Sequence, residues 1–158
     1  MSEMMCITYS FNFQDGHQET FVVNLDPVTI EVAEPLPEQL PDWTRLDFHK
    51  CAHCPLDSET QPHCPLSARI AGIVDRFAEI ISHEQTRVQV QTPQRTVSKD
   101  TTAQQGLSAL MGLVMATSGC PIMGLFKPMA AFHSQPQRKP PTGPRPCTFW
   151  HSIISTGK

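Results

Sequence analysis

Apolar and polar residues alternate strictly in the first part of the chain, which is the pattern of half-buried β-strands. Residues 7–13 and residues 21–25 each carry an apolar side chain at every second position. Between them, Asp15-Gly16 is a hairpin signal, because glycine accepts the positive φ that a tight turn needs. Residues 28–32 alternate in the same way. Residues 6–33 are therefore predicted to form a three-stranded antiparallel meander.

A different period begins at Pro65, where apolar residues recur at spacings of three and four. This spacing places them on one face of an amphipathic helix, which is expected to end near Ser82. Val88 and Val90 then alternate with polar residues, so a fourth strand is predicted that stops at Pro93.

A second helix is predicted from two overlapping matches to the capping box, Thr101 with Gln104 and Thr102 with Gln105. In such a box the threonine hydroxyl accepts a hydrogen bond from an otherwise unpaired N–H of the first turn. The apolar residues that follow extend this helix to about residue 117.

The stretch between Asp100 and Lys127 contains no charged residue and is long enough to raise the question of a membrane span. Ser118-Gly119-Cys120-Pro121 interrupts it in the middle, because glycine ends helices and proline begins them. Two short buried helices are therefore expected, the second running from Cys120-Pro121 to about Phe132.

These elements predict an α+β fold: an N-terminal antiparallel β-meander, a central cysteine knuckle, and about three helices packed on the sheet. A chain of 158 residues suits one domain, which we assign to residues 1–133. Residues 134–158 hold five prolines, only basic charge and no usable apolar period. They are expected to be a disordered or aberrant tail.

The charge of the chain is modest and unevenly distributed. Of the net charge of −3, residues 134–158 contribute +4 and the remainder −7. This balance gives no general attraction to nucleic acid or to an anionic membrane surface, and neither partner is expected. The sequence leaves open whether the chain binds a protein partner.

Cysteine is the residue type that carries candidate chemistry. Cys51, Cys54 and Cys64 lie close together, the tetrapeptide His-Cys-Pro-Leu occurs twice around them, and Cys120-Pro121 repeats the Cys-Pro pair downstream. The chain opens with neither the basic nor the apolar region of a secretory signal. Clustered cysteines in that setting favour metal binding in a reducing compartment, here the cytoplasm, over a disulfide framework.

The predicted ligands are Cys51, Cys54, Cys64 and Cys120. A Cys-x-x-Cys pair can chelate one ion, and proline after cysteine is favoured as the first residue of a helix. The thiol then lies at the helix N-terminus, where unpaired N–H groups stabilise the thiolate that binds metal. Four thiolates leave no open position for water, so zinc bound here would be structural. His49 is the alternative to Cys120 as fourth ligand, since cysteine often only packs.

Two other functions use the same cysteines. An iron–sulfur cluster ranks second, because the spacing is not a standard cluster run although proline after a ligand cysteine is familiar there. A thiol redox protein ranks third, because a thioredoxin-like motif needs a βαβ context. The sequence contains no nucleotide-binding loop and no acid–base pair that would indicate other catalysis. The pattern therefore favours a protein without enzymatic activity over an enzyme.

Four segments also resemble a small family of uncharacterised bacterial proteins over roughly residues 6–133. The segments are the Asp15-Gly16 hairpin, residues 43–56 around Cys51 and Cys54, Cys64-Pro65-Leu66, and residues 115–121. The resemblance implies no activity. It implies a further apolar helix where this chain has its basic tail, so a shifted reading frame is a hypothesis for residues 134–158.

Overall fold

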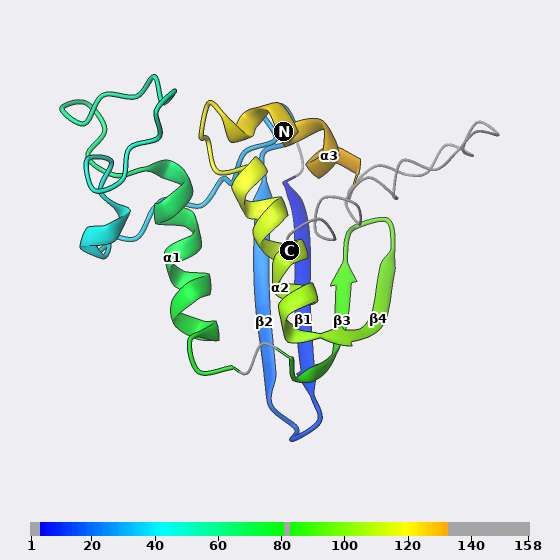
Figure 1. The fold of residues 1–158 in the computed structure, drawn as a ribbon. Coiled ribbons are helices and arrows are strands. Elements are labelled where there is room, and N and C mark those ends of the chain that lie inside the picture. The colour runs from blue at the N-terminus through cyan, green and yellow to red at the C-terminus, as the bar shows by residue number, and fades with distance from the viewer. Residues whose placement is uncertain (1–3, 81–82, 133–158) are drawn as a thin grey trace.

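The computed structural model describes residues 4–80 and 83–132. One layer is a four-stranded antiparallel sheet, and two helices cover one of its faces (Figure 1). The strand order is β2-β1-β3-β4. The strands are β1 (Met5–Phe13), β2 (Gln18–Leu25), β3 (Gln85–Gln91) and β4 (Thr96–Thr102), and the helices are α1 (Pro65–Phe77) and α2 (Ala103–Ala116). The predicted α+β class, with an antiparallel sheet at the N-terminus, is confirmed.

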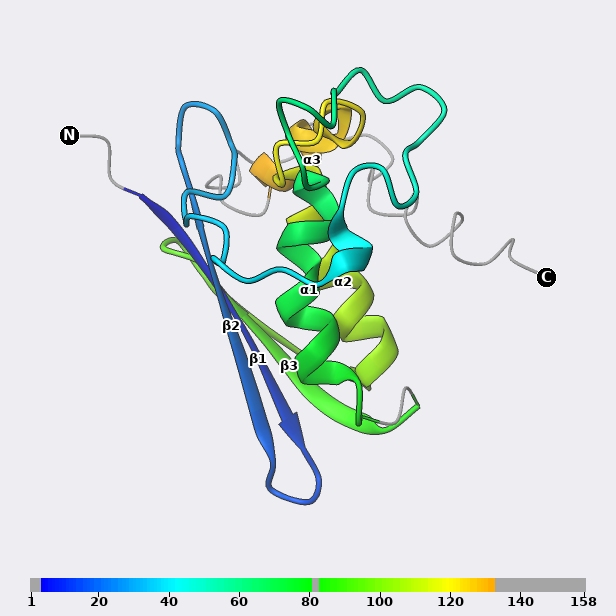
Figure 2. The same ribbon diagram turned by 90° about the vertical axis from the view of Figure 1, so that its left-hand side faces the viewer.

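The β1–β2 hairpin follows the alternation of the sequence. Gly16 has a φ of 88°, as the turn requires, and the Asp15 carboxylate accepts a hydrogen bond from the His17 N–H at 2.8 Å. Alternate apolar residues, from Ile7 to Phe13 in β1 and Phe21, Val23 and Leu25 in β2, point to one face and are buried, whereas Val22 is exposed on the other face. Figure 2 shows the sheet nearly edge-on, with both helices on this one side of it.

Residues 28–32 form a loop, and the third strand expected there is wrong. The Asp26 carboxylate accepts hydrogen bonds from the N–H groups of Val28 and Thr29, at 2.8 and 2.9 Å, which curls the chain. These bonds, the one from Thr29 foremost, lower the pKa of Asp26. Ile30 then takes a φ of 54°, and a single bridge joins Leu25 to Val32. β3 instead pairs with the other side of β1.

The β3–β4 hairpin contains one predicted strand and one that sequence reasoning missed. β3 includes the alternating Val88 and Val90. β4 has no buried residue, and the exposed ion pair of Arg87 with Asp100 (Nε to Oδ1, 2.7 Å) joins the two strands. α2 begins directly after β4. Thr102 is its N-cap and accepts from the Gln105 N–H at 3.3 Å, as the second capping-box match predicts.

The first helix, and the helical segment that follows α2, are both shorter than expected. α1 begins at Pro65 as predicted but ends at Phe77. After α2, a 3₁₀ helix, η2 (Met123–Phe126), leads into α3 (Lys127–Phe132), so helical structure starts two residues after Pro121. In the described part of the chain, no helix has the length and apolar character needed to cross a membrane. The predicted tail, residues 134–158, lies outside the described residues.

The core lies between the sheet and the helices. It is built from alternate residues of β1 and β2 and from the inward faces of α1 and α2. Phe77 of α1 contacts the rings of Phe11 and Phe21, with centroids 5.0 and 5.3 Å away. This aromatic cluster fixes α1, and with it the segment that leads into α1.

Candidate metal site in the cysteine loop

The predicted cysteine ligands Cys51, Cys54 and Cys64 lie in a loop, residues 47–64, which we call the cysteine loop. It enters from a short 3₁₀ helix, η1 (Asp42–Thr44), and leaves into α1. The two ends of the loop run antiparallel to each other. The Leu46 N–H donates to the Pro62 carbonyl and the Cys64 N–H donates to the Thr44 carbonyl, both at 2.8 Å. The loop is therefore closed at its base by backbone pairing.

A buried threonine reinforces this base. Thr44 is fully buried, and its Oγ1 donates to the Pro41 carbonyl at 2.7 Å. Since a hydroxyl carries one proton, Oγ1 must accept its second bond, and His63 Nδ1 lies 2.8 Å away as the donor. His63 is thereby held at the base of the loop. Sequence reasoning missed Thr44, although it stands in one of the segments that carry the family resemblance.

Cys51 and Cys54 lie in a tight turn in the outer part of the loop. The Cys54 N–H donates to the Cys51 carbonyl at 3.0 Å, Cys51 is exposed, and Cys54 is partly buried. No helix follows Pro55, so the expectation that Cys54 marks a helix N-terminus is wrong. The chain turns again at Asp57, whose carboxylate accepts from the Glu59 N–H at 3.0 Å.

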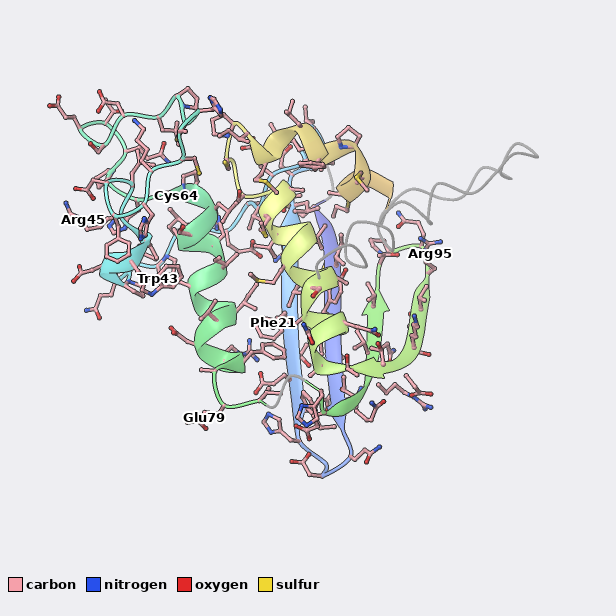
Figure 3. All side chains as sticks on the ribbon, viewed as in Figure 1. Phe21, Trp43, Arg45, Cys64, Glu79 and Arg95 are labelled. Atoms are coloured by element: carbon pink, nitrogen blue, oxygen red, sulfur yellow. The ribbon has the colours of Figure 1, made fainter. Side chains whose placement is uncertain are left out.

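Cys64 lies where the sequence predicts. It is the N-cap of α1, Pro65 is the first helical residue, and the Cys64 side chain makes no capping hydrogen bond. Figure 3 labels Cys64 at this end of α1, directly below the outer part of the loop.

Cys120 lies in the connection between α2 and η2. Gly119 precedes it with a φ of 86°, and the Cys120 carbonyl accepts from the Gly124 N–H at 2.8 Å. Both ribbon views place this connection, residues 117–122, beside the N-terminal end of α1 (Figures 1 and 2). The fold thus brings the segment that contains Cys120 toward the end of α1 at which Cys64 lies.

The four predicted ligands are not gathered at one point. Among residues 4–80 and 83–132, no three His, Cys, Asp or Glu side chains form a group that could hold a metal ion. The described cysteines, which include Cys6, are all free thiols, and His49 packs its ring against Phe48 at 5.1 Å. Cys147 lies outside the described residues. The set Cys51, Cys54, Cys64 and Cys120, with His49 as alternative, stays a prediction.

One exposed ion pair lies at the entrance to the loop. Arg45 Nε and Nη2 donate to the two carboxylate oxygens of Asp47, at 3.1 and 3.2 Å. These hydrogen bonds lower the pKa of Asp47. Because both side chains are about half exposed, the pair contributes little to stability.

The fold and this loop define a small two-layer α+β protein that presents cysteines on a long surface loop. The chain belongs to the family described as Domain of unknown function (DUF6901), whose family model matches residues 7–136. The resemblance to an uncharacterised family is thereby confirmed. No curated protein and no solved structure matches the chain.

Proposed function

We propose that the chain is a small, non-catalytic metal-binding protein in which Cys51, Cys54, Cys64 and Cys120 hold a structural zinc ion. The observation that carries this proposal is the composition of the cysteine loop. No residue from 47 to 64 is buried, yet this stretch contains three of the six cysteines. Loops longer than about 12–15 residues without helix or strand are uncommon in compact domains and usually have a function.

The energetics of the loop favour an added cross-link. Fixing the backbone costs roughly 1–2 kcal/mol per residue, and burial of apolar side chains normally offsets that cost. The cysteine loop buries none. A structural zinc site in a small peptide supplies about 10–16 kcal/mol of folding free energy. For the 18 residues of the loop the backbone cost is roughly 18–36 kcal/mol. One ion held by thiolates would therefore offset a large part of it, and the hydrogen bonds at the closed base of the loop contribute as well.

The donor chemistry fits zinc, and the fold limits where the ligands must move. Cys64 is the N-cap residue of α1, and the connection that contains Cys120 lies beside this end of α1 (Figures 1 and 2). The Cys51–Cys54 turn is the movable part, because it is held only by local hydrogen bonds in the outer loop. Binding would close this turn onto the end of α1.

The test is the metal content of the full chain, purified without oxygen or chelator. We expect about one zinc per chain, lost in Cys54→Ser and retained in the matched control Cys6→Ser, whose thiol is exposed on β1. Comparing Cys120→Ser with His49→Ala identifies the fourth ligand. Protein that contains no metal and has all its thiols free would contradict the proposal.

The same preparation separates the alternatives. An iron–sulfur cluster on these cysteines would give brown protein with visible absorption and bound iron. A thiol redox protein would contain no metal and would cycle between dithiol and disulfide at Cys51 and Cys54. We place the protein in the cytoplasm, where a reducing environment keeps such thiols free.

A further inference from the structure

A second site lies away from the cysteine loop, in a groove between α1 and the outer strand β2. The groove has a volume of about 300 Å³, at the lower end of the range for small-molecule pockets. Its apolar lining includes Phe21, Val22, Val23, Val32 and Ile73. Leu110 and Val114 of α2 also line the groove.

Arg69 of α1 contributes a positive charge to this apolar groove. Its Nη1 donates to the Glu34 carbonyl and its Nη2 to the Val32 carbonyl, the latter at 3.3 Å. These bonds use two of the five N–H donors of a guanidinium. Arg69 Nε is buried and has no hydrogen-bond partner among the described residues. A buried donor without an acceptor is unfavourable, and a bound acceptor would relieve that.

No carboxylate of the described residues forms an ion pair with Arg69. Glu34 lines the same groove, but its Oε1 accepts from the backbone and side-chain nitrogens of Asn24 at 3.2 and 2.5 Å. Burial lowers the pKa of Arg69, and the charges of Glu34 and Glu31 oppose that shift only in part. Within residues 4–80 and 83–132, the guanidinium is therefore a partly buried cation with no carboxylate in contact.

Arg76 also lines the groove but is already paired. It donates from Nε to Glu19 at 2.9 Å, and its guanidinium lies 4.0 Å over the ring of Phe21. This arrangement neutralises its charge and covers one side of the ring. Arg69 is left as the anchor for a ligand anion.

Gly72 keeps the groove open. It lies in the interior of α1 and lines the groove, and a Cβ at this position would meet no atom within 4 Å. A glycine inside a helix costs about 1 kcal/mol relative to alanine, and no steric contact requires it here. The missing side chain leaves apolar space next to Arg69.

We propose that this groove binds a small amphipathic monocarboxylate, with its hydrocarbon part on the apolar lining and its carboxylate on Arg69. A guanidinium pairs with a carboxylate through two parallel N–H donors, and three of the five remain for it. A single negative charge fits best, because Glu34 and Glu31 would repel a doubly charged phosphate. This proposal does not depend on the zinc site.

The test uses the full chain and sodium octanoate as probe, with 1-octanol as the neutral analogue, in calorimetric titrations. We expect octanoate to bind at least about tenfold more tightly than octanol, since a hydrogen-bonded charge is worth at least one factor of ten. Arg69→Met should remove that difference. Arg87→Met, which removes an exposed arginine from β3, is the matched control and should bind like the unmodified chain.

A second pair of variants tests the location without removing the arginine. Gly72→Phe fills the groove and should abolish binding of octanoate and octanol while the circular dichroism spectrum stays unchanged. Val74→Phe adds the same ring to an exposed position of α1 and should bind normally. Equal affinity for acid and alcohol, binding that persists in Gly72→Phe, or a dimer whose second copy covers Gly72 would each overturn the proposal.

Discussion

The sheet and helices, which we call the body, have a buried apolar core, whereas the cysteine loop of the same chain has none. In the body, Ile7, Phe11, Leu25 and Leu110 have no exposed surface at all. In the cysteine loop, every residue from 47 to 64 is at least partly exposed. The body is therefore held by burial of apolar surface, whereas the loop depends on its closed base and on whatever its thiols bind.

The largest expected contrast comes from removing one ring from each region. Phe11→Ala should lower the free energy of unfolding by about 3–5 kcal/mol, because it opens a cavity under the aromatic cluster. Phe48→Ala should change it by less than about 0.5 kcal/mol, because Phe48 is 56% exposed in the loop. Urea unfolding measures both. Similar losses in the two variants would mean that the loop has a core of its own.

Alkaline pH sharpens the comparison through Tyr9, the only tyrosine of the chain. Burial raises the pKa of Tyr9 from 10.0 to about 12, since the phenolate is disfavoured in the core. The neutral phenol thus contributes stability that is fully present below pH 10 and is lost as pH rises through 12. Two pH units correspond to roughly 3 kcal/mol.

The measurement is urea unfolding from pH 8 to 12, compared with Tyr9→Phe, which cannot ionise there. The unmodified chain should lose stability relative to the variant between pH 10 and 12. Parallel curves would show that Tyr9 ionises freely in the folded body.

The smallest of the three effects compares two helical glycines. A Cβ at Gly106 of α2 would lie 2.6 Å from Val88 Cγ2 and 2.7 Å from Phe11 Cε1, so Gly106→Ala should destabilise by about 1–3 kcal/mol. Gly72→Ala should instead stabilise by up to about 1 kcal/mol, because helix propensity acts alone there. Thermal unfolding measures whether each variant is more or less stable than the unmodified chain. A Gly106→Ala variant of unchanged stability would show that α2 packs loosely on the sheet.

Much of the body could be predicted because burial leaves a periodic signal. Alternation located β1, β2 and β3, and Pro65 and Thr102 marked the starts of both long helices. β4 could not be found this way. It is an edge strand with no buried residue, so it has almost no apolar alternation, and only its pairing with β3 defines it.

Residues 28–32 show the opposite failure. They alternate as a strand does, but side-chain hydrogen bonding at Asp26 outweighs the pattern and forms a turn. The alternation shows only which side chains are apolar. It carries no information on the hydrogen bonds that the Asp26 carboxylate accepts from the backbone just after it.

The candidate site was predictable only in its parts. Cys64-Pro65 gave the correct helix start, because proline constrains its own backbone. Cys54-Pro55 gave the wrong one, because the residues after it form a turn at Asp57. The groove at Arg69 was not predicted, since it depends on how far α1 stands from β2, which no local pattern encodes.

The order of the strands has a consequence for the speed of folding. Each hairpin joins neighbours in the chain, but the central pairing of β1 with β3 brings together residues such as Asn12 and Arg87, 75 positions apart. Bringing residues this far apart together costs conformational entropy before the stabilising contacts between the strands form, and this cost slows folding. We expect the two hairpins to form early and the pairing of β1 with β3 to limit the folding rate.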